Sequence, residues 1–455
     1  MKTLVIIGSG FSGTVTAIEF LRRRAGEVQL VIVNRSGSMA RGLAYGTNSS
    51  QHLLNVPAGN MTALVDEPDS FLDYCQAMYP ESAGHSFMPR KLYGQYLHTL
   101  LDTELKQRSE TARHVVAEVT HIERSGECAL LYLSTGEVLK ADHVVLAFGN
   151  FSPLKPALMK APELQDHYHN DPWAISKQNP IAPQDPVLLL GSGLTALDVL
   201  ASLKQNEHHG AIYMLSRRGL LPVAHRKMKQ PGLNVSNVND TLLSGPATVL
   251  TYLRSIRSLI ETHRCDGIDW RDILATLRPI TPSLWKRLPE PERKRFLRHL
   301  QPFWDVHRHR AAPQTYSTFE AGLESGQVTA IAGRLTDVRH SAGMLDLTVR
   351  TRKAQQTLLI SVRHVINCTG PNSNLAHIDE LFITGLINNG TLVPDRLGLG
   401  LQTDDQLAVV DQQGHPSDWL SYVGPMLKAG WWEATAVPEL RQHSRNLAIR
   451  LADSL

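Results

Sequence analysis

The chain has 455 residues, of which 42% are hydrophobic and 20% charged, and its formal net charge is +3 at pH 7. This length exceeds what one ordinary hydrophobic core organises, so we expect two or three domains. The small positive charge argues against a surface that wraps nucleic acid. No stretch approaches the roughly 18 consecutive apolar residues of a membrane span. We therefore expect neither nucleic acid nor a membrane as a partner.

The N-terminal residues 1–10 have a basic start and an apolar run but lack the length and cleavage site of a signal peptide. The four cysteines (Cys75, Cys128, Cys265 and Cys368) are scattered, and no two have C-x-x-C spacing. This usage is typical of a reducing compartment and indicates neither a zinc site nor a sequence-adjacent redox dithiol. We expect a cytoplasmic protein without a bound metal.

The first motif is a glycine loop directly after an apolar run at residues 3–7. It reads Gly8-Ser9-Gly10-Phe11-Ser12-Gly13, and a helical pattern follows at once. A dinucleotide site has this strand, turn and helix, with the helix N-terminus facing the pyrophosphate. Gly8 is expected to form the turn, Gly10 to admit the pyrophosphate, and Gly13 to let the helix pack closely. A plain turn is the alternative reading.

A second strand is expected at residues 28–33, and an acid that binds ribose hydroxyls normally follows it. Here Asn34 and Arg35 stand in its place. Asn34 can still form a hydrogen bond with a hydroxyl, and the pair also suits a 2′-phosphate. This loop alone therefore does not choose between FAD and NADP.

The second glycine loop follows an apolar run at residues 187–190 and reads Gly191-Ser192-Gly193-Leu194-Thr195-Ala196. Alanine is an accepted third residue of the fingerprint. After the next strand, 212–215, the chain reads Ser216-Arg217-Arg218. Two guanidinium groups and a hydroxyl suit a 2′-phosphate, which favours NADPH over NADH. A solvated basic turn is the alternative.

Two such loops about 180 residues apart indicate two bound dinucleotides, as in an enzyme that passes hydride from a nicotinamide to a flavin. Apolar strands that end in small residues support this, one with Ala147 and Gly149 and one at 365–371. We predict an α/β fold with two Rossmann-like dinucleotide-binding domains and a discontinuous FAD domain. The expected boundaries are 1–175 (FAD), 176–310 (NADPH, with a helical insert at about 226–303) and 311–455 (FAD, second part).

The C-terminal region has three features that suit the flavin. Gly424 ends another apolar strand, and Trp432-Glu433 precedes Ala436-Val437-Pro438-Glu439. Proline and glutamate suit the first turn of a helix, whose free N–H groups could face the pyrimidine edge of the flavin. An ordinary capped terminal helix is equally compatible with these residues.

The chain resembles the bacterial FAD/NAD(P)-binding oxidoreductases related to class B flavin monooxygenases and N-hydroxylating monooxygenases. Besides the first glycine loop, the motifs that carry the resemblance are His52–Ala58, Pro89–Tyr96, Trp304–Arg310, Trp432-Glu433 and Ala436–Glu439. The resemblance implies that Asn55 and Val56 lie beside the isoalloxazine ring, that the Val119 backbone meets the adenine, and that Arg90 with Tyr96 shapes the cofactor pocket. For Asn55, a loop residue that caps a turn before Pro57 is the alternative.

Apolar residues between 249 and 303 recur at helical spacing. They predict an insert that either completes the core or covers the flavin as a lid. The run 305–310 combines two histidines with Arg308 and Arg310, and in an extended segment the two residue types would lie on opposite faces. With Asn55, these arginines are our candidate catalytic residues, since they could clamp a substrate carboxylate or an NADPH phosphate. A structural network of ion pairs is the alternative, and the spacing does not suit zinc.

Together these features favour an FAD-dependent NADPH oxidoreductase that acts on a small organic substrate. A monooxygenase that uses O2 through a flavin hydroperoxide is our leading hypothesis, with N-hydroxylation of an amine as its first form. An electron-transfer reductase and a non-catalytic nucleotide sensor remain alternatives, whereas the absence of a nearby cysteine pair disfavours a disulfide reductase. The oligomeric state is not predicted.

Overall fold

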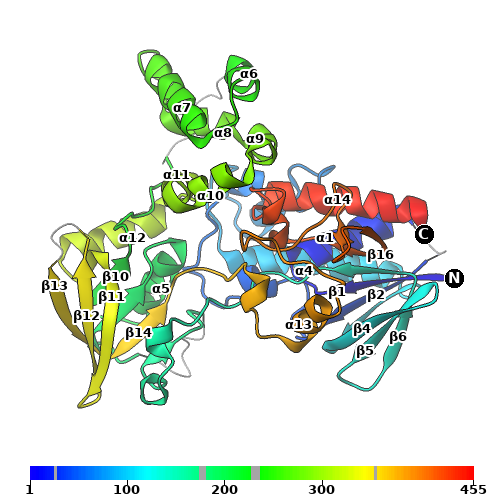
Figure 1. The fold of residues 1–455 in the computed structure, drawn as a ribbon, viewed down its shortest axis with the longest axis horizontal. Coiled ribbons are helices and arrows are strands. Elements are labelled where there is room, and N and C mark those ends of the chain that lie inside the picture. Colours follow the sequence, from blue (N-terminus) through cyan, green and yellow to red (C-terminus); the bar gives the residue numbers. More distant parts are fainter. Residues whose placement is uncertain (25–27, 174–180, 227–235, 353–355) are drawn as a thin grey trace.

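The computed structural model describes residues 1–24, 28–173, 181–226, 236–352 and 356–455. Two separate β-sheets lie side by side, and a group of helices stands above the space between them (Figure 1). No helix among the described residues is long and apolar enough to cross a bilayer.

The first sheet has six strands, five of them parallel. Their order is β15 (Ala408–Val410), β16 (Pro416–Tyr422), β7 (His143–Leu146), β1 (Lys2–Ile7), β2 (Val28–Asn34) and β3 (Ala112–Val116). The central strands are almost wholly apolar because helices cover both faces of a parallel sheet. A smaller antiparallel sheet of β4 (Val119–Ser125), β5 (Cys128–Leu133) and β6 (Val138–Ala141) belongs to the same half of the molecule.

The second sheet has seven strands. Their order is β13 (Thr357–Val362), β12 (Met344–Thr351), β11 (Val328–Ser341), β10 (Ile212–Ser216), β9 (Val187–Leu190), β14 (His364–Asn367) and β8 (Tyr168–His169). The strands from β11 to β8 are parallel, and β12 and β13 extend β11 as an antiparallel meander.

This topology corrects one predicted boundary. We expected the chain to return to the FAD domain at residue 311, but β11 to β14 all belong to the second sheet, which therefore spans Tyr168–Asn367. An apolar strand pattern shows that a segment is a strand but not which sheet it joins, and the sequence therefore misplaced this return. The boundary predicted at 175/176 lies outside the described residues.

We call the six-stranded and three-stranded sheets with their helices the first unit, and the seven-stranded sheet with its helices the second unit. The helices of both units, in chain order, are α1 (Phe11–Arg23), α2 (Gly42–Tyr45), α3 (Ser70–Met78), α4 (Arg90–Gln107), α5 (Leu194–Gln205), α12 (Pro313–Glu324), α13 (Leu381–Asn388) and α14 (Val437–Ser454). Short 3₁₀ turns occur at Ala58–Asn60, Ala157–Met159, Pro162–Leu164, Arg278–Ile280, Leu375–His377 and Pro425–Ala429.

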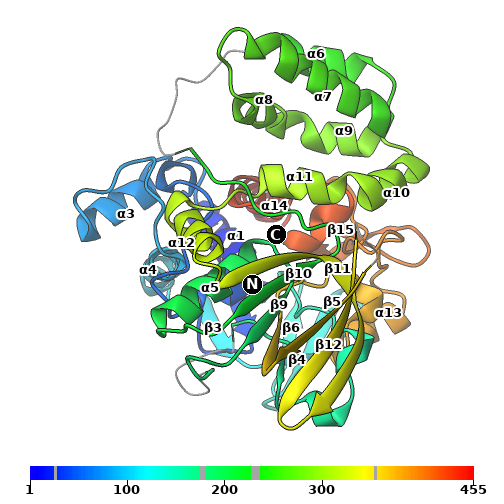
Figure 2. The same ribbon diagram turned by 90° about the vertical axis from the view of Figure 1, so that its left-hand side faces the viewer.

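Within the described residues the insert consists of six helices, and its hydrophobic core also includes Leu399, Ala429 and Trp432 from the C-terminal part of the chain. The six helices are α6 (Ser236–Ser244), α7 (Val249–Arg264), α8 (Trp270–Thr276), α9 (Thr281–Arg287), α10 (Glu290–His299) and α11 (Gln301–Arg308). Helices α6 to α9 stand above α10 and α11, which lie against the rest of the molecule (Figure 2). Residues 227–235, where the predicted insert begins, are outside the described part.

Candidate active site

The first glycine loop is shaped by close backbone contacts at its two outer glycines. Gly8 has φ +105°, and a Cβ on it would lie 2.7 Å from the Ala147 carbonyl oxygen. A Cβ on Gly13 would lie 2.0 Å from the Gly8 carbonyl oxygen. A Cβ on Gly10 would meet nothing closer than the Gly42 Cα at 3.8 Å. The fold itself therefore requires Gly8 and Gly13, whereas Gly10 leaves an open cradle that fits a pyrophosphate.

Helix α1 begins directly behind this cradle with its N-terminus free. Gly10 is the N-cap and has no side chain to accept from the first turn, which carries no acidic residue. Phe11 and Ser12 are the first helical residues, and Phe11 stacks on the buried Tyr93 with 6.3 Å between ring centroids. Unpaired N–H groups and the positive end of the helix dipole suit an anion at this point.

Asn34 and Arg35 at the end of β2 have partners within the protein. The Asn34 carboxamide oxygen accepts from the Ser9 N–H at 3.2 Å, and its NH2 group donates to the Ser36 carbonyl. Asn34 thus holds the glycine loop in place, a task that the ribose prediction did not include. Arg35 is 66% exposed in its side chain and forms an ion pair of 3.3 Å with Glu380.

The other predicted FAD residues of the first sheet gather at the carboxyl edge of its parallel strands. Ala147 and Gly149 follow β7, and the Val423 N–H donates to the Leu146 carbonyl at 3.0 Å. Gly424 follows β16, while Val119 begins β4 and is buried, three residues after β3 ends. Parallel strands bring these positions together because their carboxyl ends share one edge, where open α/β sheets bind ligands.

Helix α14 begins at Val437 after the N-cap Ala436, as the sequence indicated, and runs parallel to α1. The Ser444 hydroxyl donates to the Ser12 carbonyl at 3.3 Å, and the Arg24 side chain donates to the Ala452 carbonyl at 2.6 Å. Both helices therefore direct their N-termini to the same side of the first sheet, where two anionic parts of a flavin nucleotide would be stabilised.

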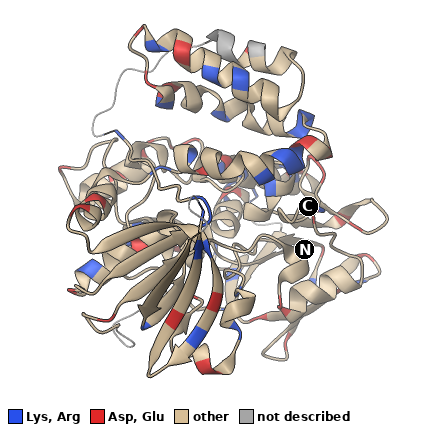
Figure 3. Ribbon diagram, turned by 60° about the vertical axis from the view of Figure 1, so that its left-hand side comes forward, with Lys and Arg blue, Asp and Glu red and all other residues tan. Residues whose placement is uncertain are grey.

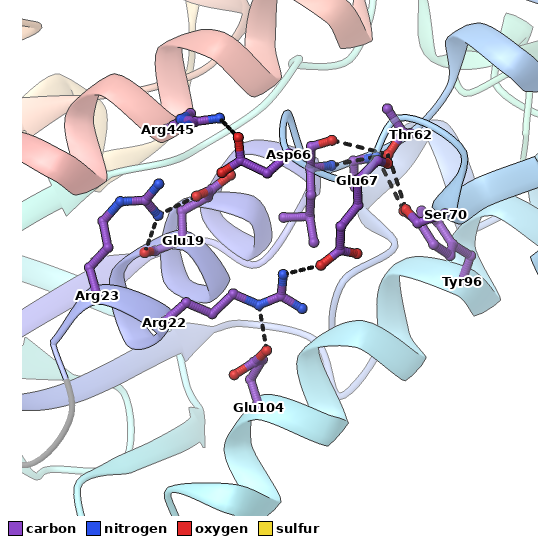
Figure 4. Close-up of polar contacts among 12 residues, drawn as sticks. Glu19, Arg22, Arg23, Thr62, Asp66, Glu67, Ser70, Tyr96, Glu104 and Arg445 are labelled. Carbon is purple, nitrogen blue, oxygen red and sulfur yellow. Dashed lines mark hydrogen bonds and ion pairs between the residues drawn. The ribbon is translucent and has the colours of Figure 1, made fainter.

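A polar network at the opposite end of α1 connects four segments of this unit (Figure 4). Arg22 pairs with Glu67 and Glu104, and Arg445 of α14 pairs with Asp66 at 2.6 Å. Tyr96, which the resemblance placed in the cofactor pocket, forms a hydrogen bond with Ser70. These contacts hold α1, α4 and α14 in register behind the glycine loop.

Arg308 and Glu433, predicted on separate grounds, meet as a buried ion pair with 3.0 Å between Nη2 and Oε2. Lys428 and Asp305 lie in the same electrostatic cluster. Burial raises the pKa of Asp305 against the opposing effect of Lys428, and burial lowers the pKa of Lys428 against Asp305 and Glu433. Lys428 was missed by the sequence analysis because its isolated position in a 3₁₀ turn gave no signal.

The segment 305–310 does not have the extended conformation for which we considered alternating faces. Residues up to Arg308 lie in α11, so the imidazoles and guanidiniums do not alternate between two faces. Burial lowers the pKa of His309 to about 3, with a further contribution from Arg308. Burial also lowers the pKa of Arg310 to about 10, helped by the positive charges of Arg271 and Arg308. This concentration of positive charge would favour an anionic group nearby.

A side chain of the second unit contacts the backbone of Asn55. His225 Nε2 donates to the Asn55 carbonyl oxygen at 2.9 Å, and burial with the nearby Arg310 lowers the pKa of His225 to about 4. The imidazole is therefore neutral near pH 7. Val56, beside Asn55, packs on the core of the first unit. His225 was missed because only tertiary structure brings it to this loop.

Arg90 connects the two units. Its Nε donates to the Leu53 carbonyl at 3.1 Å, and its Nη2 lies 2.8 Å from Asp198 Oδ2 on α5. Burial raises the pKa of Asp198 to about 6 against the opposing charge of Arg90. His52 makes a parallel connection, with Nε2 2.7 Å from the Ser202 hydroxyl of α5. Arg90 thus joins the loop at Leu53 in its own unit to α5 in the second unit.

The second glycine loop repeats the geometry of the first. Gly191 has φ +124°, and a Cβ on it would lie 2.3 Å from the Cys368 carbonyl oxygen at the end of β14. A Cβ on Gly193 would meet nothing within 4 Å. Gly193 is the N-cap of α5, where Leu194 and Thr195 begin the helix without a side-chain cap or an acidic residue in the first turn. This loop presents a second open, positively polarised helix N-terminus.

The three predicted 2′-phosphate residues at the end of β10 do not share one role. The Ser216 hydroxyl accepts from the Gly219 N–H at 3.1 Å. Arg218 donates to the carbonyls of Arg298 and His299 at the end of α10, the latter at 3.1 Å. Arg217 remains exposed.

Arg352 is a further cation near this position. Burial lowers the pKa of Arg218, and the positive charges of Arg352 and Arg217 lower it further. Arg352 lies after β12, 134 residues from Arg218 in the sequence, and only the pairing of β11 with β12 brings it here. Three cations therefore surround the place expected for a 2′-phosphate.

Comparisons with known proteins agree with this geometry. Residues 5–151 match a family model described as FAD-NAD(P)-binding. The first part of the chain is a FAD/NAD(P)-binding domain. A sequence search of curated proteins finds no match.

Solved structures share the fold over the whole chain. The ornithine N-hydroxylase of Kutzneria sp. 744 has a TM-score of 0.67 at 12% identity and covers 99% of this chain and 98% of its own. The ornithine hydroxylase of Pseudomonas aeruginosa has a TM-score of 0.66 at 14% identity, with 99% of each chain covered. The L-lysine 6-monooxygenase of Pseudomonas syringae has a TM-score of 0.62 at 16% identity and covers 100% of this chain and 99% of its own.

The family match and the shared fold confirm the predicted class. The chain shares the α/β fold of these structures, which confirms the predicted fold class, and residues 5–151 match the predicted FAD/NAD(P)-binding domain. Among the described residues, no group of three His, Cys, Asp or Glu side chains could hold a metal ion.

Proposed function

We propose that the protein is an NADPH-dependent FAD monooxygenase that acts on a small organic substrate. The observation that carries this proposal is the repeated strand, glycine loop and uncapped helix N-terminus in two separate sheets. Two phosphate cradles in one chain serve two dinucleotides, and a flavin with a nicotinamide is the pair that transfers hydride.

The first cradle would hold FAD. The N–H groups of Phe11 and Ser12 would bind the pyrophosphate above Gly10, and the N-terminus of α14 at Val437 would face the flavin. When bound, the flavin supplies hydride acceptance and the reaction with O2. The neutral His225 orients the backbone of Asn55, which we propose to lie beside the flavin ring.

The second cradle would hold NADPH. Gly193 and the first turn of α5 would bind its pyrophosphate, and Arg217 with Arg352 would neutralise its 2′-phosphate. Arg308 and Arg310 would attract an anionic group of substrate or cofactor beside Glu433, and the protein would exclude water from this region.

The cysteines support an oxygenase over a dithiol reductase. All four are unpaired, and Cys75 and Cys368 are buried. Burial raises the pKa of Cys75 to about 12, which leaves its thiol unreactive. Four free cysteines also support the expected reducing, cytoplasmic setting. The structural neighbours named for ornithine and lysine support N-hydroxylation of an amine as the first reaction to test.

Stopped-flow absorbance tests the proposal directly. Purified protein reconstituted with FAD is reduced by NADPH without oxygen and then mixed with oxygenated buffer. We expect faster reduction by NADPH than by NADH, followed by a transient band distinct from oxidised flavin. Immediate return of the oxidised spectrum would instead favour a reductase, and a protein that never binds FAD would contradict both.

A further inference from the structure

The helical insert carries a cavity of about 500 Å³ that is open to solvent on one side and has no lining residue in either glycine loop. Helices α7, α8, α9, α10 and α11 and the C-terminal Trp432 line it. Small-molecule sites have volumes of about 300–1,000 Å³, and most of their lining is apolar. The cavity therefore has the size of a ligand site rather than of a packing defect.

Its lining is almost entirely aliphatic and aromatic. It includes Leu253 and Ile256 of α7, Leu274 of α8, and four of the seven tryptophans of the chain: Trp270, Trp285, Trp304 and Trp432. The cavity wall, all of it within the described residues, contains no acidic side chain. A cationic amine would consequently lose hydration there without gaining an ion pair.

A few polar groups accompany this apolar wall. Arg257 lines the cavity and is exposed. His307 Nδ1 donates to the Phe303 carbonyl at 2.7 Å, which leaves Nε2 as an acceptor. These groups would orient one polar end of an otherwise apolar molecule.

Two lining side chains also carry buried polar atoms without a partner. Within the described structure, neither the Tyr252 hydroxyl nor the Trp304 indole N–H has a hydrogen-bond partner. Native proteins satisfy most buried polar groups, so each exception calls for an explanation. Both atoms lack accessible surface and therefore lie behind the cavity wall, so the exposed Arg257 is the donor that an acceptor group of a ligand would meet.

Helix α11 and Trp432 separate the cavity from the candidate flavin side. Trp304 and His307 line the cavity, whereas Arg308 on the same helix pairs with Glu433, the residue after Trp432. Lys and Arg positions are spread along the helices of the insert (Figure 3). An occupant of the cavity would thus contact the same helix and loop that position the buried Arg308–Glu433 pair.

We propose that this cavity is a binding site for an apolar small molecule with an aromatic or branched body and one neutral or anionic acceptor group. It discriminates against diamines and basic amino acids. The site goes beyond the proposed oxygenase activity, since its existence requires neither NADPH nor oxygen.

Isothermal titration calorimetry of the FAD-loaded protein with 2-naphthol tests this inference, with L-ornithine as the polar comparison. We expect saturable binding of 2-naphthol at one site with a negative heat-capacity change, the mark of apolar burial. L-Ornithine at the same concentrations should not compete. Absence of saturable 2-naphthol binding, or equal competition by L-ornithine, would overturn the proposal.

Two substitutions on one helix locate the site. Leu253→Trp fills the cavity and should weaken 2-naphthol binding at least tenfold, whereas Leu250→Trp, on the exposed side of α7, should change it less than twofold. Ile256→Phe is a milder second variant if Leu253→Trp fails to fold. Equal affinity in the cavity variants and Leu250→Trp would place the ligand elsewhere. FAD content and NADPH-driven reduction are measured in the same samples, so loss of either reports on the proposed function separately.

Discussion

Arg217 and Arg218 are neighbours in the sequence with different surroundings. Arg218 donates to two carbonyls at the C-terminal end of α10, where a helix attracts a cation. Arg217 is exposed at the end of β10, and Arg352 approaches from the adjacent strands. Arg218 thus has partners within the protein, and we propose that Arg217 and Arg352 bind the 2′-phosphate.

Single alanine variants separate these tasks. Arg217→Ala and Arg352→Ala should each raise the NADPH concentration for half-maximal flavin reduction about tenfold, since a charge-assisted hydrogen bond contributes about 1.5–3 kcal/mol. The NADH concentration for half-maximal flavin reduction should stay unchanged. Arg218→Ala should mainly lower the melting temperature. Anaerobic reduction kinetics with both nucleotides provide the measurement, and an intact NADPH preference in Arg217→Ala would show that the 2′-phosphate lies elsewhere.

At the scale of elements, the two strand–loop–helix units use one design. In each unit, the first glycine of the loop has a positive φ and packs against a backbone carbonyl just after the neighbouring parallel strand. Gly8 packs against Ala147, and Gly191 packs against Cys368. The next glycine, Gly10 or Gly193, borders open space at the helix N-terminus. The fold therefore requires the first glycine of each loop, whereas the second leaves space in which we propose that a ligand binds.

Alanine at these two positions should give opposite results. Gly10→Ala should keep the stability of the FAD-free protein but bind little FAD, because the added methyl group occupies the pyrophosphate cradle. Gly8→Ala should destabilise the FAD-free protein by about 1–3 kcal/mol or more, because it combines strained backbone with a 2.7 Å clash. Flavin absorbance and thermal melts of both variants measure this. Normal FAD content in Gly10→Ala would refute the cradle.

At the scale of the molecule, three buried contacts hold the two sheet units together. They are His52 with Ser202, Arg90 with Asp198, and His225 with Asn55. Burial lowers the pKa of His52 from 6.5 to about 4, with help from Arg90. The folded protein therefore holds this histidine neutral at a pH where the unfolded chain protonates it.

The stabilising effect of a neutral His52 should depend on pH. It is fully present above pH 6.5 and is lost as the pH falls from about 6.5 through 4, because the unfolded chain binds about one more proton there. The difference in unfolding free energy between wild type and His52→Gln should accordingly shrink over this range. Urea unfolding at a series of pH values measures it, with His415→Gln, on an exposed turn, as the control. A constant difference would show that His52 does not titrate with folding.

The sequence by itself determined the two glycine loops, their order, the helix at Val437 and the fold class. These features are local: a positive φ or a close backbone approach demands glycine at one position, and a strand and helix beside it make the motif specific. Only the tertiary structure decided which sheet β11 to β14 join, which side chain meets Asn55, and how Arg218 differs from Arg217. It also created the insert cavity. These outcomes depend on pairing and packing between segments far apart in the chain, which no local pattern encodes.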